Sequence, residues 1–144
     1  MKSCIRTIII FLCIIFLAGV ATCRYWYRAF AYEEQIQDYY YLIAVDDEKY
    51  MDISYNNGGG TFSVIPSTVF AVGYNENFII AKQHPCYFAE PIDKTITHYY
   101  IIPIKNNPNN NAIGPLTLEQ FYEKRKELNV PDSVKFTKEF EKLK

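Results

Sequence analysis

The chain has 144 residues, a formal net charge of −1 and a hydrophobic content of 49%. This length suffices for one domain, and the composition is that of a globular protein and not of a disordered one. The near-zero charge excludes a strongly basic nucleic-acid-binding protein, so no nucleic acid partner is expected. Aromatic residues make up 17% of the chain, which predicts a core built largely from rings.

An apolar leader opens the chain. Lys2 and Arg6 precede the uncharged run TIIIFLCIIFLAGVATC at residues 7–23, and a basic start followed by an apolar stretch is typical of export signals. The run also approaches the minimum length of a membrane-spanning helix, about 17 residues. Residues 1–23 are therefore predicted to be a signal peptide or a membrane anchor.

Three alternatives for this leader remain open. A cleaved signal peptide is compatible with the small residues around 18–21. A bacterial lipoprotein signal makes Cys23 the lipidated residue, because VATC at 20–23 resembles a lipobox. An uncleaved anchor accounts for the aromatic residues at 25–27, which suit a membrane interface. All three alternatives place the C-terminal domain outside the cytoplasm. The lipidated and anchored forms also hold the protein at the membrane through its lipid or N-terminal segment, and the overall prediction is a membrane-anchored protein of the bacterial cell envelope.

Residues 24–38 are expected to form a tether or a helical extension, and residues 39–144 an extracytoplasmic domain. Within that domain, aromatic and β-branched runs predict strands, at 39–45, 49–55, 61–65, 69–74, 77–83 and 97–105. NNGGG at 56–60 precedes a strand and not a helix, so it is predicted to be a hairpin tip and not a phosphate-binding loop. Pro103 predicts that its end of the last strand lies at a sheet edge.

One helix is predicted at residues 117–128. Thr117 is a good N-cap, and Gln120 completes a capping-box pattern. The side chains expected to face the sheet are Leu118, Phe121, Tyr122 and Leu128. The segment 134–144 fits a strand or a helix equally well. The predicted fold class is therefore α+β, an antiparallel sheet of about five strands with this helix packed on one face.

Three short motifs carry a family resemblance: VGYNENFIIAKQ at 72–83, YYII at 99–102 and IGPLT at 113–117. They resemble the signature of a bacterial domain-of-unknown-function family of small exported, lipoprotein-like proteins. The resemblance covers roughly the second half of the chain. It implies a location in the cell envelope and no assigned reaction.

Chemistry-bearing side chains are few in the predicted domain. His84, Cys86 and His98, with Asp93 between them, are candidates for a small thiol enzyme or a metal site. However, no electropositive surroundings for a thiolate are evident, and the spacing matches no recurring zinc pattern. We therefore assign no catalytic, metal or cofactor-binding residue. The favoured interpretation is a non-catalytic binding or structural module with a protein or cell-wall partner, and the site built from these four residues is the alternative.

Overall fold

The computed structural model describes Ile10, residues 13–16, Gly19, residues 32–86 and residues 91–140. The described leader residues are helical. Among the described residues, no helix has both the length and the apolar character needed to cross a bilayer. Cys23 and the expected cleavage and lipidation positions lie outside the described residues, so the leader alternatives stay predictions.

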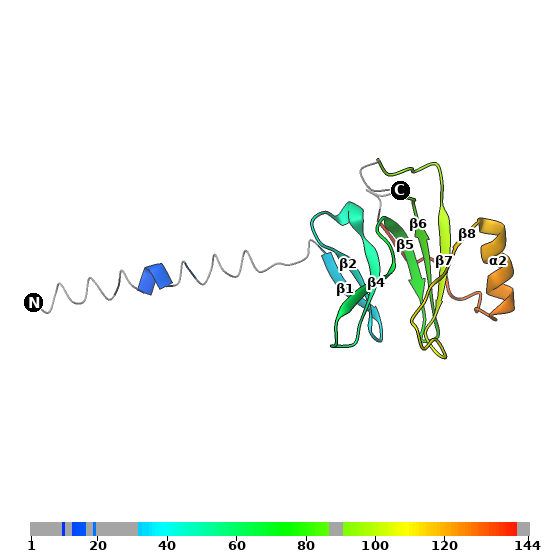
Figure 1. Ribbon diagram of the computed structural model, residues 1–144, viewed down its shortest axis with the longest axis horizontal. Coiled ribbons are helices and arrows are strands. Elements are labelled where there is room, and N and C mark those ends of the chain that lie inside the picture. The colour runs from blue at the N-terminus through cyan, green and yellow to red at the C-terminus, as the bar shows by residue number, and fades with distance from the viewer. Residues whose placement is uncertain (1–9, 11–12, 17–18, 20–31, 87–90, 141–144) are drawn as a thin grey trace, which may run out of the picture.

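The described part of the chain is mostly β-structure. In chain order the elements are β1 (Tyr32–Gln37), β2 (Tyr40–Ala44), the 3-10 helix η1 (Glu48–Tyr50), β3 (Asp52–Asn56), β4 (Thr61–Ile65), β5 (Val69–Tyr74), β6 (Phe78–Gln83), β7 (His98–Pro103), β8 (Ile113–Leu116), α2 (Leu118–Glu127) and β9 (Lys138–Glu139). The strands form two antiparallel sheets, ordered β1-β2-β3-β4 and β8-β7-β6-β5-β9. Figure 1 shows three layers: the first sheet, the second sheet and α2.

The expected single sheet of about five strands is therefore corrected to two sheets of four and five strands. The chain changes sheet between β4 and β5, where Pro66 ends one strand and the Val69 amide donates to the Met51 carbonyl at 2.9 Å. Both sheets turn an apolar face inward, and Leu42, Ile53, Ile79 and Ile102 are fully buried between them. Local strand patterns do not say which strands share a sheet, so this division is a tertiary property.

Strand β1 lies within the segment expected to be a tether or helical extension. In β1, Ile36 is buried while Glu33 and Gln35 are exposed, which is the alternation of a half-buried strand. The strand is also held by a salt bridge between Glu34 and Lys138 near the C-terminus. That distant partner is invisible in local sequence, which explains why the segment was not expected to be a strand.

The second sheet is covered on both faces. Its outer face packs under a second cluster formed by Ile80, Ile101, Phe121, Val130 and Val134. Gly73 in β5 allows residues 134–136 to lie directly on the sheet, because a Cβ atom there would be 1.9 Å from the Lys135 carbonyl oxygen. The segment expected to be either strand or helix thus covers β5 and ends in the short strand β9.

Helix α2 confirms the predicted capping box, since the Thr117 side chain accepts from the Gln120 amide and the Gln120 side chain accepts from the Thr117 amide. Its buried stripe is narrower than expected, because only Phe121 is buried in the helix while Leu118 and Tyr122 are 48% and 57% exposed. Pro103 is not at a sheet edge, because β7 lies between β6 and β8. Pro103 is the last residue of β7, where the missing backbone N–H of proline does not interrupt the hydrogen bonds between strands.

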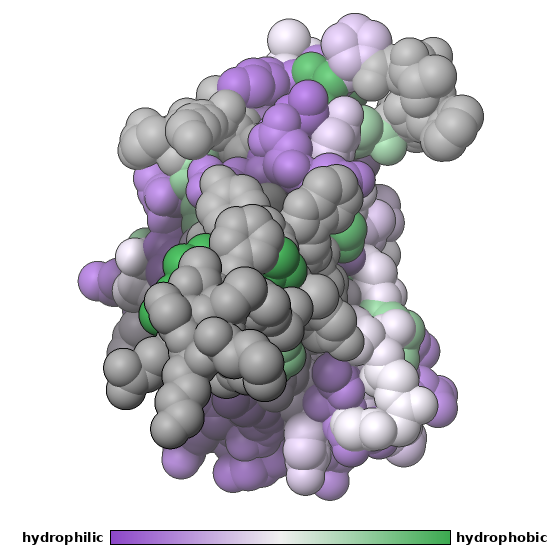
Figure 2. All heavy atoms as spheres, turned by 90° about the vertical axis from the view of Figure 1, so that its left-hand side faces the viewer, coloured by the Kyte–Doolittle hydropathy of each residue, from purple (hydrophilic) through white to green (hydrophobic). Residues whose placement is uncertain are grey.

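The side of the molecule formed by the first sheet is polar. Figure 2 views this side and shows hydrophilic or weakly polar side chains over most of the coloured surface. The outward positions of β1 and β4 include the exposed Glu33, Gln35 and Ser63. The exposed rings on this sheet include Phe62 of β4, which is 47% exposed and contacts Tyr55.

Candidate functional site

His84 directly follows β6 and is 4% exposed. Its ring stacks on Phe70 with the centroids 4.2 Å apart and the planes at 11°. Its Nδ1 lies 2.7 Å from the Ile96 carbonyl oxygen. Because a carbonyl only accepts, Nδ1 must carry a proton, and the other ring nitrogen is Nε2. That atom is buried without a hydrogen-bond partner among the described residues, so His84 acts as a packed core side chain.

His98 begins β7 beside the buried amide of Gln83. Its Nδ1 is 3.4 Å from Gln83 Oε1, and the Tyr100 hydroxyl donates to the same oxygen at 3.2 Å. Gln83 Nε2 donates to the carbonyls of Pro66 and Ser67 at 3.3 and 3.1 Å. Burial raises the pKa of Tyr100, which keeps its hydroxyl a donor. This network ties β6 and β7 to the corner where the chain changes sheet.

Asp93 and Cys86 are the other two candidate residues. The Thr95 hydroxyl and amide donate to Asp93 Oδ1 at 2.6 and 2.9 Å, and they hold the pKa of this exposed carboxyl below its ordinary value. Cys86 is a half-buried free thiol. Across the described residues, no group of three or more His, Cys, Asp or Glu side chains is placed to hold a metal ion. His84, His98 and Asp93 therefore each have a different hydrogen-bond partner.

A pocket of about 440 Å³ lies beside His98 at the start of α2. Its lining includes Tyr99, Leu116 and Thr117 but no acidic residue and no cysteine. General acid–base or thiol chemistry needs a second group within hydrogen-bond reach of the first. The His98 ring has no such acidic or thiol partner in this lining.

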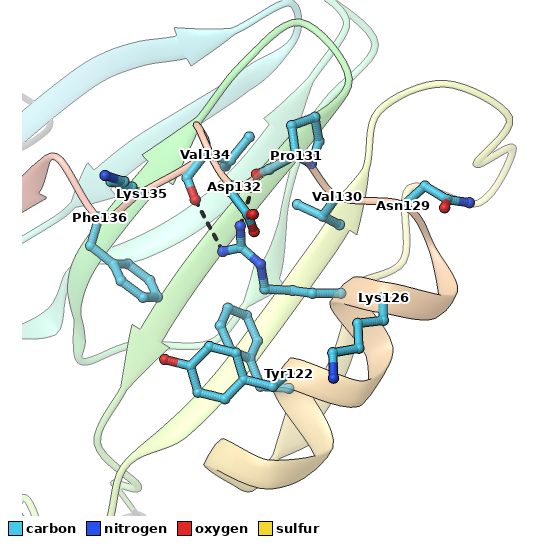
Figure 3. A pocket seen from close by; sticks show the side chains of 11 residues that line it. Tyr122, Lys126, Asn129, Val130, Pro131, Asp132, Val134, Lys135 and Phe136 are labelled. Atoms are coloured by element: carbon cyan, nitrogen blue, oxygen red, sulfur yellow. Dashed lines mark hydrogen bonds between the residues drawn. The ribbon is translucent and has the colours of Figure 1, made fainter.

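A larger pocket, of about 710 Å³, lies between α2 and the segment 129–136, and we call it the α2 pocket. Its volume falls in the range of small-ligand and peptide sites, about 300–1,000 Å³. Tyr122 of α2 and Phe136 of the C-terminal segment extend into the same space in Figure 3. Phe121 supplies a buried ring below Tyr122, with their centroids 5.8 Å apart. The walls are thus aromatic on two sides.

Arg125 joins the two sides of the α2 pocket. Its guanidinium donates to the Val134 carbonyl at 3.0 Å and to the Pro131 carbonyl at 2.8 Å, the two dashed lines of Figure 3. The guanidinium carbon is also 5.6 Å from the centroid of the Phe121 ring. Arg125 therefore fixes the distance between the helix and the segment, so the pocket is preformed.

Positive charge gathers around the α2 pocket. The described residues include nine Lys and Arg side chains, of which Lys49, Lys124 and Lys138 form salt bridges. Four of the other six are at the pocket: Arg125, Lys126 and Lys135 line it, and Lys82 Nζ is 4.4 Å from the centroid of the Phe136 ring. Asp132 is the acidic residue in the lining. The pocket is therefore basic in a chain whose net charge is slightly negative.

Sequence reasoning missed the α2 pocket for two reasons. It placed Tyr122 on the buried face of the helix, whereas the ring is largely exposed. It also left residues 134–144 as either a strand or a helix, although residues 134–136 form part of one wall. The available signals were Gly73, which marks a close approach of another backbone, and the basic run KRK at 124–126.

Fold and site together define a small, three-layered β-protein with a basic aromatic pocket on its helical side. The chain belongs to a family of proteins of unknown function, DUF3997, whose family model matches residues 37–141. The resemblance to a family without an assigned function is thereby confirmed, and the match extends over both sheets and not only the second half of the chain. No curated protein and no solved structure matches the chain.

Proposed function

We propose that this protein is a non-catalytic binding module of the bacterial cell envelope, held at the membrane by its N-terminal segment. The observation that carries the binding role is the α2 pocket, which is preformed and has aromatic walls and a basic rim. Concave aromatic surfaces with a few placed polar groups are the usual form of binding sites. The envelope location rests on the leader sequence and its basic start at Lys2 and Arg6.

The arrangement of the reactive side chains supports a non-catalytic role. Nucleophilic catalysis by Cys86 requires a base in hydrogen-bond reach. His84 Nδ1 faces the Ile96 carbonyl, and its other ring nitrogen, Nε2, is buried without a hydrogen-bond partner among the described residues, the Cys86 thiol included. His98 meets the side-chain amide of Gln83, which neither takes up nor releases protons. The partner is therefore expected to be bound and not chemically changed.

Two measurements test the location. Mass spectrometry of the mature N-terminus should find a lipidated Cys23, an intact Met1 or a cleaved leader, and each outcome selects one alternative. Protease added to intact spheroplasts should degrade the domain. A full-length chain that is dissolved in the cytoplasm and protected from protease would contradict the envelope role.

Photo-crosslinking in intact cells tests the binding role. p-Benzoylphenylalanine placed at Tyr122 should give a discrete adduct upon irradiation, because this ring is 57% exposed in the pocket. Tyr50 is 44% exposed on η1, away from the pocket lining, and is the matched control position. Equal adducts from both positions, or none from Tyr122, would contradict binding at the α2 pocket.

A further inference from the structure

The ligand chemistry of the α2 pocket follows from its charges. Lys82 comes from β6, Arg125 and Lys126 from α2, and Lys135 from the C-terminal segment, so three separate parts of the chain bring positive charge to one place. Basic residues in the last turn of a helix also interact with the helix dipole, which explains Arg125 and Lys126 in part. It does not explain Lys82 and Lys135, which lie outside the helix.

The lining also contains the Asp132 carboxylate, but the four positive side chains around the pocket outnumber it. None of the four forms a salt bridge with a described carboxylate, whereas the next lysine along the helix, Lys124, pairs with Glu127. Like charges that gather around a concave surface repel one another and raise the local concentration of anions. A negatively charged ligand relieves that repulsion, so the pocket is electrostatically complementary to an anion.

The walls add a requirement for an apolar group. Phe121 is 1% exposed and forms the floor, while Tyr122 presents its ring to solvent. The cations near Phe121 and Phe136 lie over ring faces, where the aromatic quadrupole attracts them. A planar or aliphatic group between Tyr122 and Phe136 would bury apolar surface while its acidic neighbours reach Lys126 and Lys135 at the rim.

We propose that the α2 pocket binds an acidic peptide segment of a partner protein, in which an aromatic or large aliphatic residue is flanked by Asp or Glu. This inference rests on the proposed binding function and specifies its ligand. The aromatic residue enters the pocket between Tyr122 and Phe136. The flanking carboxylates lie against Lys126 and Lys135, which Figure 3 shows at opposite sides of the pocket.

Fluorescence anisotropy with labelled pentapeptides tests the proposal on the full chain in non-ionic detergent micelles. The probe is Asp-Glu-Trp-Glu-Asp. Gln-Gln-Trp-Gln-Gln lacks its charge, and Asp-Glu-Gly-Glu-Asp lacks its ring. Only the first should bind saturably, and its affinity should fall as salt is raised, because the rim charges are exposed to solvent. Equal binding of all three peptides, or no saturable binding of the probe, would overturn the inference.

Two double variants with the same change in net charge locate the site. K126E/K135E reverses the two exposed lysines of the pocket, and K49E/K105E reverses two exposed lysines elsewhere. The first should weaken probe binding by at least about tenfold and the second by less than about twofold. Equal losses would show a general charge effect and would overturn the assignment to the α2 pocket.

Tyr122→Ala should weaken binding of the probe by about fivefold, because it removes one aromatic wall. Tyr50→Ala is its control and should change nothing. Vesicles of phosphatidylglycerol provide a last comparison. If they bind through Lys126 and Lys135 while the peptide does not, the pocket takes lipid headgroups and the peptide proposal is wrong. Failure of the peptide together with a discrete crosslink from Tyr122 would reject this ligand and leave the binding function standing.

Discussion

The two sheets differ in what covers them. The first sheet buries one face against the second and presents Glu33, Gln35 and Ser63 to solvent on the other. The second sheet is buried on both faces, by the first sheet on one side and by α2 with residues 130–136 on the other. This difference explains where a site can form. The outer face of the second sheet is covered by two separate parts of the chain, α2 and residues 130–136, and the α2 pocket is the space between them.

The largest expected effect comes from removing the ring that joins helix and sheet. Phe121→Ala should cost about 4 kcal/mol of unfolding free energy, because Phe121 is buried against Tyr99 and Phe136. Leu118→Ala, on the same helix but 48% exposed, should cost less than about 1 kcal/mol. Urea denaturation of both variants measures the contrast. Equal losses would mean that α2 is not held by a single buried ring.

Gly73→Ala tests the other segment that covers the second sheet, residues 134–136. The added Cβ would meet the Lys135 carbonyl carbon at 2.6 Å as well as its oxygen, so residues 134–136 must lift off β5. We expect a loss of about 3 kcal/mol, with weakened probe binding because one pocket wall moves. Gly59→Ala in the β3–β4 turn is the control, because its Cβ would meet only the flexible Asn57 side chain, at 3.3 Å. A Gly73→Ala protein as stable as this control would contradict the close approach.

The Glu34–Lys138 pair sharpens the comparison, because it links the edge of the first sheet to the end of the second. The Lys138 ammonium, and then the Tyr32 hydroxyl, donate to Glu34 and lower the pKa of this carboxyl. Because the pKa of Glu34 is lower in the folded than in the unfolded state, the ionised carboxylate stabilises the fold. This contribution is present above the unfolded pKa of about 4.3 and is lost as the pH falls through the folded pKa. Glu34→Gln should therefore cost up to about 1 kcal/mol at pH 7.

Thermal unfolding at pH 7 and pH 3 measures this contribution, and the difference between Glu34→Gln and the wild type should shrink at the lower pH. A double-mutant cycle with Lys138→Gln isolates the pair. A coupling energy of zero at pH 7 would contradict a stabilising role of the Glu34–Lys138 pair between β1 and β9.

The smallest expected effect concerns the open face of the first sheet. Burial raises the pKa of Asp52, although the hydroxyls of Ser54 and Ser63 oppose the shift. Because the pKa of Asp52 is higher in the folded than in the unfolded state, the protonated carboxyl stabilises the fold. This contribution is fully present below the unfolded pKa of about 3.9 and is lost as the pH rises through the folded pKa. Asp52→Asn should thus stabilise the protein by less than about 1 kcal/mol at pH 7 and by nothing near pH 3.

Differential scanning calorimetry at the two pH values checks the gain. Asp93→Asn is the control, since hydrogen bonds from Thr95 shift the pKa of Asp93 in the opposite direction. A gain from Asp93→Asn at pH 7, or none from Asp52→Asn, would contradict the assigned causes.

The strands made of continuous apolar runs were the most predictable elements for a physical reason. Strands buried on both faces appear as continuous apolar runs, and the predicted boundaries of β5 coincide with the observed Val69–Tyr74. The capping box of α2 was predictable because Thr117 and Gln120 act within one turn. In contrast, β1 and β9 depend on partners far along the chain, and β8 is a four-residue strand containing Gly114 and Pro115.

The candidate site was less predictable than the fold. His84 and His98 attract attention as rare residue types, yet their ring nitrogens face a backbone carbonyl and an amide oxygen. The α2 pocket consists of common residues that become a site only when Lys82, Tyr122 and Phe136 are brought together. The spacing of these residues in the sequence does not predict that they meet. They come together only because the C-terminal segment folds back over β5.

The late position of that segment has a consequence for biosynthesis. Val134 completes the cluster beneath α2, and the Phe140 amide donates to the Phe70 carbonyl at 2.8 Å to cover the edge of β5. Glu34 forms its salt bridge with Lys138, which lies 104 residues later in the chain. A nascent chain that has not yet added residues 134–140 leaves part of an apolar sheet face bare and the edge of β5 unpaired, and such surfaces are prone to aggregation and are bound by chaperones.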